Sequence, residues 1–153
     1  MSYWDWALEV HGRPGVDEAL ITLQDYHGQC VAYLLWAAWS AAEGRTPPPE
    51  LLMQAAALSK RWEGTATMAL RSARKLLKAP APPIPDEARL ALREQVRELE
   101  FAAERLLMET LESLTPEPEG GPADLADRLI TASRAWGRTA PETELRALAG
   151  LIS

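Results

Sequence analysis

Apolar residues recur along most of this chain at spacings of three and four, which is the period of helices that bury one face. Three proline clusters interrupt the pattern, at residues 47–49, 80–85 and 116–122, and no helix interior can run through them. The strict alternation that marks β-strands is nearly absent. The pattern therefore predicts an all-α protein, a compact helical bundle with proline-rich loops.

Two short helices are predicted before residue 30. The first begins near Ser2, whose spacing to Asp5 fits a capping box, and it stops at residues 12–14. The second starts after Gly15 and meets Gly28, a natural left-handed stop. The residues expected on the inner sides of these helices are Trp4, Leu8 and His11 in the first, and Val16, Leu20, Leu23 and His27 in the second.

Residues 30–43 form the most apolar predicted helix, which Gly44 ends. Its first ten residues leave no polar face, so we expect it to be the central buried helix. That run is about half of the ~20 residues needed to cross a bilayer, so we expect no membrane insertion. The six tryptophans of the chain could line a pocket or a partner groove, but at helical spacing we interpret them as core residues.

Two longer helices follow and are expected to pack as an antiparallel hairpin. The apolar spacing runs from Leu51 to Leu76, with Gly64 as the position of a kink. Beyond the second proline cluster it resumes at Leu92 and continues to about Leu114, with Asp86 as the expected cap.

Two further amphipathic helices are predicted in the C-terminal tail. One carries Leu125, Leu129, Ala132 and Trp136 on one side, and the last carries Leu145, Leu148 and Ile152. We divide the chain into a helical bundle domain, residues 1–114, an acidic Pro/Gly linker, residues 115–123, and a helical tail, residues 124–153. We expect the tail to pack on the same domain.

Positive charge is concentrated in the first helix of the expected hairpin. Residues 60–78 contain six basic residues and one acidic residue, a net charge of +5, whereas the rest of the chain carries −11. Arg71, Lys75 and Lys78 share one helical face, and Arg74 lies beside them. This arrangement could hold a phosphate, a carboxylate or an acidic peptide.

The partner helix offers a simpler use for these charges. It carries Glu94, Glu98, Glu100 and Glu104, and antiparallel packing sets Arg71 roughly opposite residues 94 to 98. Cross-helix ion pairs would then neutralise the basic face, and we favour this structural account because paired surface charges are common and weak.

A second cluster lies at residues 24–28, where the second helix ends. Asp25 opposes the helix dipole there, and such departures from local preference often mark functional sites. His27 is favourable at the same position and is interpreted as a packed capping residue. Cys30 lies three residues beyond His27, but as a lone cysteine opening an apolar helix it is expected to be an inert buried thiol.

Composition excludes several functional classes. The net charge of −6 argues against nonspecific nucleic-acid binding, which needs a concentrated positive surface. The sequence contains no Gly-rich phosphate loop, no Gly-x-Ser-x-Gly motif, no zinc-type Cys/His spacing and no Glu-x-x-His pair of helical di-iron sites. We therefore expect no metal and no cofactor. The single cysteine and the absence of a secretory pattern favour the cytoplasm.

Several segments resemble a family of short, conserved, hypothetical proteobacterial proteins that is classed as a domain of unknown function. The segments are WDWALEVHGRPGV, LQDYHGQCVAYLLWAAWSAAEGR and ALRSARKLLK, followed by ELEFAAERLL. The resemblance covers about residues 3–114 and implies a cytoplasmic helical protein, with no activity attached. Where the family pattern has Asn, this sequence has Ala32. The signature implied by the resemblance is Trp4, Asp25, His27, Gly28, Trp36 and Arg71.

Two functional hypotheses follow, and the oligomeric state stays open in both. The first is a non-enzymatic protein-binding or regulatory module that holds a protein or peptide on the basic helix or on another exposed helical face. The alternative is a binding site or small enzyme in which Arg71, Arg74 and Lys75 hold an anionic small molecule and Asp25 or His27 acts as acid or base. A cavity shared by Asp25, His27 and Arg71 would favour the alternative. A third possibility, an oligomerisation module, predicts an exposed Leu/Trp stripe on the hairpin.

Overall fold

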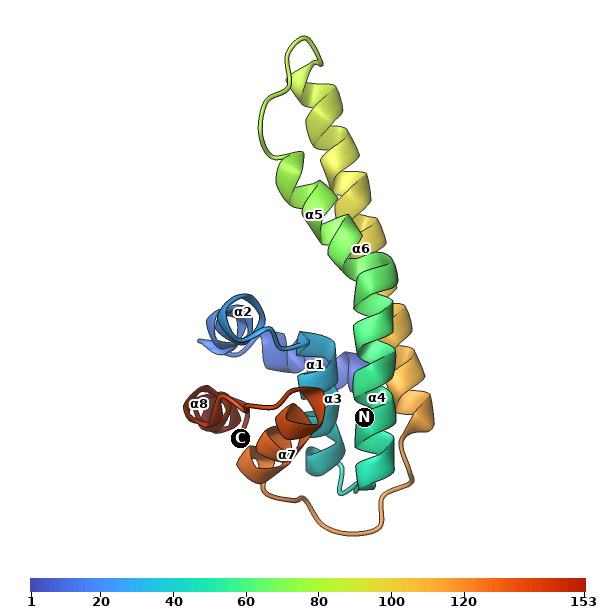
Figure 1. Ribbon diagram of the computed structural model, residues 1–153, viewed down its shortest axis with the longest axis vertical. Coiled ribbons are helices and arrows are strands. Elements are labelled where there is room, and N and C mark those ends of the chain that lie inside the picture. The colour runs from blue at the N-terminus through green and yellow to red at the C-terminus, as the bar shows by residue number, and fades with distance from the viewer.

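The computed structural model describes residues 1–153 and contains helices and loops only, which confirms the all-α prediction. The helices follow one another in the order shown in Figure 1. Their bounds are α1 Tyr3–His11, α2 Val16–His27, α3 Val31–Ala42, α4 Pro49–Trp62, the π-helix η1 Glu63–Thr67, α5 Met68–Leu76, α6 Asp86–Leu114, α7 Leu125–Trp136 and α8 Glu142–Ile152.

Helix α3 is the centre of the molecule, as its apolar sequence predicts. Nine of its twelve residues are buried, including Tyr33, Trp36 and Trp39, which have no exposed surface. Helices α1, α4, α6 and α7 all pack against it. The ring of Tyr33 stacks on that of Trp136 of α7 at a centroid distance of 5.6 Å. Four tryptophans are buried and the other two pack against the core at its edge, so the interpretation of tryptophans as core residues is confirmed.

Two predicted glycine stops take the left-handed backbone conformation. Gly28 ends α2 with a φ of 61°, and Gly44, which follows α3, has a φ of 68°. At Gly44 a side chain would also collide with the linker, because a Cβ atom there would lie 2.1 Å from the carbonyl oxygen of Gly120. Glycine is therefore required at this turn by both conformation and space.

Ser2 caps α1 as predicted, without the return bond of a full capping box, but the predicted inner side of the helix is wrong. The Ser2 hydroxyl accepts a hydrogen bond from the Asp5 amide. Leu8 and His11 are exposed, and the buried side carries Tyr3, Trp6, Ala7 and Val10. Apolar residues surround most of this nine-residue helix, so spacing alone could not choose a side, and the greater apolar area of Tyr3 and Trp6 decides it.

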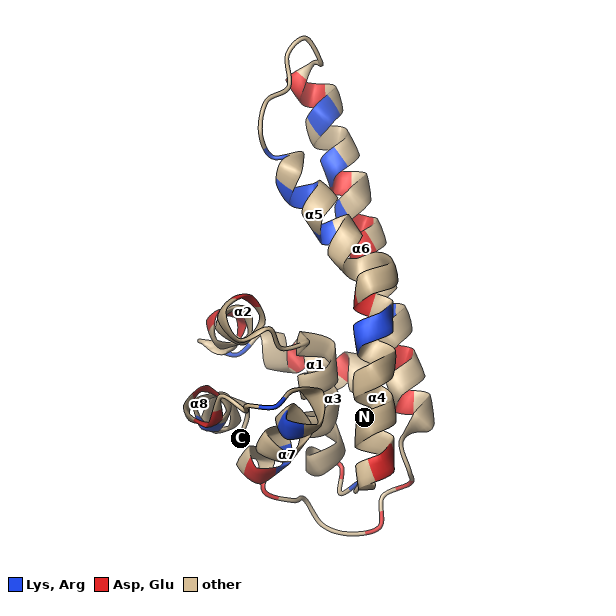
Figure 2. Cartoon of the chain, viewed as in Figure 1, with Lys and Arg blue, Asp and Glu red and all other residues tan.

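Helices α5 and α6 form the predicted antiparallel hairpin, which extends well beyond the other helices (Figure 1). No residue of α5 is buried, and lysines and arginines cluster on it (Figure 2). Asp86 is the first residue of α6 and makes no capping hydrogen bond, so its predicted role as the cap is wrong. Because Pro85 already fixes the start of the helix, the Asp86 carboxylate is free to pair with Arg89. The Arg89 guanidinium also donates to the carbonyls of Leu77 and Lys78.

The C-terminal helices complete the core. Helix α7 packs against α3 and α4, and α8 packs against α2 and α7. Polar contacts hold α7 in place: the Tyr33 hydroxyl donates to the Ala132 carbonyl at 3.0 Å, and the Trp136 indole donates to the Gly28 carbonyl at 2.8 Å. None of the helices combines the length and the apolar character that a membrane crossing requires.

Candidate functional site

A cavity of about 380 Å³ lies between the N-terminal helices and the base of the hairpin. Helices α1 and α2 and the start of α3 form one side, and η1, α5 and α6 form the other. Nine of its 18 lining residues are hydrophobic, so the wall is amphipathic. Its volume falls within the roughly 300 to 1,000 Å³ of typical small-molecule sites.

The π-helix η1 places two polar side chains on this wall, Glu63 and Thr67. The Met68 amide donates to the Glu63 carbonyl, five residues back, which is the hydrogen bond of a π-turn. The local sequence favours the irregularity, because Gly64 and two threonines are poor helix formers between two strong helical segments. Short π-segments inside α-helices occur frequently at functional sites.

Glu63 is the one cavity carboxylate that forms no ion pair. Burial raises its pKa, and the neighbouring Cys30 thiol and the positive charge of Arg71 offset this only in part. Burial also raises the pKa of the Cys30 thiol well above its usual range, and the negative charge of Glu63 adds to the effect. The thiol is thus protonated at neutral pH and unreactive, as expected from the sequence.

Thr67 is 3% exposed and its hydroxyl has no hydrogen-bond partner. Other helical threonines donate their hydroxyl to the carbonyl four residues back: Thr22, Thr110 and Thr131 do so in α-helices, and Thr65 does so within η1. For Thr67 that carbonyl belongs to Glu63, and it already accepts the π-turn hydrogen bond from the Met68 amide. A buried hydroxyl without a partner is rare in proteins, because it costs free energy relative to water.

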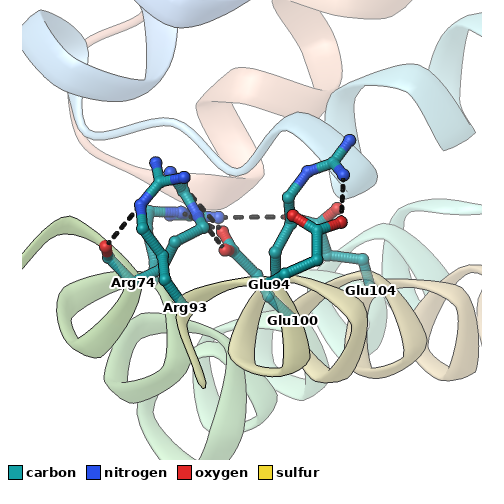
Figure 3. A network of polar contacts seen from close by, with 7 residues as sticks. Arg74, Arg93, Glu94, Glu100 and Glu104 are labelled. Carbon is teal, nitrogen blue, oxygen red and sulfur yellow. Dashed lines mark hydrogen bonds and ion pairs between the residues drawn. The ribbon is translucent and has the colours of Figure 1, made fainter. Parts of the chain in front are cut away.

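Two arginines of α5 and two glutamates of α6 form a network on the hairpin side of the cavity (Figure 3). Arg71 contacts Glu100 at 3.2 Å and Glu104 at 3.3 Å, and Arg74 contacts Glu100 at 2.5 Å. Arg93 fixes the neighbouring backbone by donating to the Arg74 carbonyl at 3.2 Å. The cross-helix pairing expected from the sequence is thus present, but with glutamates that lie further along α6 than Glu94 and Glu98.

The direction of the arginine side chains explains this shift. Helical side chains tilt toward the N-terminus of their own helix, and in an antiparallel hairpin that is toward the C-terminal end of the partner. Arg71 therefore reaches Glu100 and Glu104 instead of Glu94, which pairs with Arg97 within α6.

The two network glutamates titrate differently. Burial alone would raise the pKa of Glu100, but its hydrogen bonds and ion pairs with Arg74 and Arg71 outweigh burial and lower the pKa. Burial raises the pKa of Glu104, and the charge of Arg71 does not fully compensate. Together the two arginines and two glutamates are neutral, so the network contributes fixed hydrogen-bonding groups and no excess charge.

The remaining polar groups of the cavity have partners within the protein. At the rim, the His11 imidazole contacts the Asp17 carboxylate at 2.6 Å, and both side chains are largely exposed. In the interior, the fully buried Tyr3 hydroxyl donates to the Ala32 carbonyl at 2.5 Å. Burial raises the pKa of Tyr3, so this phenol is a permanent donor. No group of three or more histidine, cysteine or acidic side chains is arranged to hold a metal ion.

The structure brings together only part of the site suggested by the sequence. Arg71 and Arg74 line the cavity. Asp25 is exposed and contacts its neighbour Gln24, and His27 pairs with Glu144 of α8 at 3.5 Å, so neither faces the cavity. Lys75 is exposed on α5 and forms no ion pair. Residue 25 lies on a side of α2 that turns away from Leu20 and Gln24, which do line the cavity. Residue 27 lies on the same side as these two, but at the last turn of α2 it contacts α8 instead.

Glu63 and Thr67 are not part of the site predicted from the sequence. The available signal was the segment Glu-Gly-Thr-Ala-Thr within an otherwise strong helical pattern, of which only the glycine was noted. Tyr3 and Cys30 were also not associated with a site, because their proximity to η1 depends on tertiary packing.

The chain belongs to the DUF2390 family, described as a protein of unknown function, which it matches over residues 2–111. This match agrees with the resemblance noted in the sequence to a family of unknown function. No curated protein and no solved structure matches the chain. Every residue that lines the cavity, from Tyr3 to Met108, lies within the matched segment, whereas α7 and α8 lie outside it.

Proposed function

We propose that this member of the DUF2390 family is a cytoplasmic small-molecule binding protein whose ligand occupies the cavity between α2, α3 and the base of the hairpin. The observation that carries the proposal is the pair of groups on η1: a partly buried Glu63 without an ion pair and a buried Thr67 hydroxyl without a partner, both on the cavity wall. Proteins satisfy nearly all such groups, so a ligand that supplies the missing contacts explains both.

The binding geometry differs from the anionic site inferred from the sequence. Arg71 and Arg74 direct their hydrogen bonds to Glu100 and Glu104. An anion would have to displace these carboxylates, which costs the charge-assisted hydrogen bonds that they already make. The cavity itself, and not the exposed basic face, is therefore the proposed site, and Asp25 and His27 have no part in it.

A fragment screen by two-dimensional amide NMR would test the proposal. We expect members of a library of neutral and charged fragments to shift the resonances of the cavity wall, such as those of Thr67 and Val31. Ala32→Phe places an aromatic ring at the cavity wall without altering any charged group, and should abolish these shifts. Ala57→Phe, on the exposed side of α4, is the matched control. Shifts that persist in Ala32→Phe, or none in the wild type, would contradict the proposal.

A second candidate function, protein binding, is favoured by the apolar side of the hairpin. Leu92, Leu99 and Leu106 of α6 are 50%, 57% and 56% exposed and recur every seven residues, so they lie on one face. On α5, Leu76 is 75% exposed. Such a row is typical of a helix that packs against another helix, which is the partner we propose for this surface.

Site-specific crosslinking would test this second candidate. A photoreactive residue in place of Ala102, between Leu99 and Leu106, should give a discrete protein adduct in cells, and Leu99→Glu should remove it. The same residue at Ala57 should give no such adduct. Absence of an adduct at Ala102 would argue against a helical partner on this face.

A further inference from the structure

The charge balance of the cavity identifies the kind of ligand that would fit it. This step rests on the proposed function above. Four carboxylates line the cavity, and three of them have partners: Asp17 pairs with His11, and Glu100 and Glu104 pair with arginines. Glu63 is the fourth and forms no ion pair, its polar neighbour being the Cys30 thiol. The wall thus presents one uncompensated carboxylate in a partly buried position, where the missing group is a cation.

We infer that the ligand is a small primary amine with an apolar body, whose ammonium group forms an ion pair with Glu63 and a hydrogen bond with the Thr67 hydroxyl. Both residues belong to η1 and lie about one helical turn apart. Because the Thr67 oxygen is buried in the free protein, the inference includes a rotation of this side chain that turns its hydroxyl toward the ligand. A hydroxyl accepts a hydrogen bond through its oxygen, and an ammonium group has three donors to distribute. One unpaired carboxylate matches one positive charge.

The remainder of the wall sets the character of the ligand body. The side chains of Leu20, Leu35, Leu107 and Met108 line the cavity and are buried, and Val31 lines it beside them. They offer an apolar surface with no unpaired polar group. A volume of about 380 Å³ is near the lower limit for ligand sites, which favours a short aliphatic or aromatic amine over a nucleotide or a long polyamine.

Two other cationic occupants fit less well. A metal ion needs at least three suitable ligands, and the cavity provides no such group. A guanidinium ligand prefers a carboxylate with both oxygens available in a plane, whereas Glu63 shares its surroundings with the Cys30 thiol. An ammonium group has no such geometric requirement.

A matched pair of probes distinguishes the sign of the ligand charge. n-Butylamine and butyric acid have the same chain length and carry opposite charges at pH 7.5. We expect n-butylamine to shift the amide resonances of Glu63, Thr67 and Leu35 in an NMR titration, with a roughly millimolar dissociation constant for so small a probe. We expect butyric acid to leave them unchanged at equal ionic strength.

Variants then test the two contacts. Glu63→Gln should weaken n-butylamine binding by about 10-fold or more, because it removes a charge-assisted hydrogen bond. Thr67→Val should weaken it by about 3-fold, and the exposed Glu98→Gln on α6 should have no effect. Glu63→Asp keeps the charge and should still bind n-butylamine in preference to butyric acid. This variant shows whether the loss in Glu63→Gln comes from the missing charge or from a general disturbance of η1.

The possible outcomes separate this inference from the proposed function. Butyric acid or neutral fragments that bind in the cavity while n-butylamine does not would overturn the amine inference alone. Binding of n-butylamine that is unchanged in Glu63→Gln would also overturn it. A cavity that takes no fragment of any charge would overturn both.

Discussion

At the scale of single residues, the groups of interest are Glu63 and Thr67, which the surrounding helices hold in unfavourable surroundings. Glu63 is partly buried without an ion pair, and Thr67 is buried without a hydrogen-bond partner. Residues held at such a cost lower the stability of the free protein, and functional sites are where such costs are found. Substitutions that relieve the cost should therefore stabilise the fold, which is the reverse of the usual effect of mutation.

Glu63→Gln should raise the melting temperature at pH 7.5. Because the folded-state pKa of Glu63 is raised above its ordinary value of 4.5, its protonated form favours folding, and that contribution is lost as the pH rises through the folded pKa. The gain from glutamine should therefore shrink as the pH falls toward 4.5. Thermal unfolding followed by circular dichroism between pH 4 and 8 would measure it. The exposed Glu98→Gln should show no comparable trend, and an equal trend in both variants would contradict the argument.

Thr67→Val should raise the free energy of unfolding by about 1 kcal/mol, because it removes a buried hydroxyl that has no partner. The matched variant is Thr65→Val, two residues away, where the hydroxyl donates to the Arg61 carbonyl and is exposed. That change should be neutral or slightly destabilising. Urea unfolding of the wild type and the two variants would measure these differences. A loss of stability in Thr67→Val would show that the Thr67 hydroxyl has a hydrogen-bond partner in solution.

At the scale of elements, the Arg–Glu network joins α5 to α6, and Glu100 is its common member. Its side chain is 10% exposed and contacts both arginines. Glu100→Gln should lower the free energy of unfolding by about 2 to 4 kcal/mol, because it leaves two arginines without their shared carboxylate. Since the pKa of Glu100 is lowered in the folded state, its contribution is present above pH 4.5 and is lost as the pH falls.

The comparison variant for this network is Glu94→Gln. Glu94 pairs with Arg97 on the surface of α6, where both side chains are more than half exposed. Its loss should change the free energy of unfolding by less than about 0.5 kcal/mol. Equal effects of the two substitutions in urea unfolding would argue that the Glu100 network is no stronger than an ordinary surface pair.

The glycines that end α2 and α7 test the effect of backbone conformation on stability without any change in side-chain contacts. Gly28 has a φ of 61°, and a Cβ atom there would meet nothing within 4 Å, so Gly28→Ala should cost about 1 to 2 kcal/mol from backbone conformation alone. Gly137 has a φ of −150° and equal space, so Gly137→Ala should not destabilise. Thermal unfolding would compare them, and equal losses would show that conformation is not the cause.

These elements also show what the sequence could predict. Prolines and glycines act locally, so the helix bounds near Gly28 and Gly44 and the α5–α6 hairpin followed from them directly. The buried side of α1 did not, because it depends on which aromatic residues find space against α3 and α6. The π-turn was also missed: Gly64 indicated an irregularity, but its type depends on a hydrogen-bond shift that no residue pattern encodes.

The candidate site was predictable only in part for a related reason. The pairing of arginines with glutamates follows from opposite charges on antiparallel helices, and this much the sequence indicated. The cavity itself arises where α2 and the hairpin fail to meet, which depends on three-dimensional packing. Asp25 is unfavourably placed at a helix end, yet the rotation of about 100° between adjacent residues of α2 directs it to solvent while Gln24 faces the cavity.

At the scale of the whole molecule, the tail is part of the core. Leu129, Ala132 and Leu145 are fully buried, and α7 covers the Tyr33 side of α3. A chain that ends at Leu114, the end of the sequence-defined bundle, should therefore lose cooperative unfolding and show poorly dispersed amide resonances. A chain that ends at Gly150 removes only the last turn of α8 and should remain folded. A cooperatively folded 1–114 chain would show that the bundle stands alone.

The hairpin divides the molecule into two parts that differ in how they exchange amide hydrogens with solvent. Between Met68 and Arg97 only Arg89 is buried, so local opening of the distal turns of α5 and α6 breaks few buried contacts and costs little free energy. Their amides should exchange through local fraying at rates that are insensitive to substitutions in α3, whereas the amides of α3 should exchange only when the whole bundle unfolds. A ligand at Glu63 would slow exchange at the root of the hairpin and leave its tip unchanged.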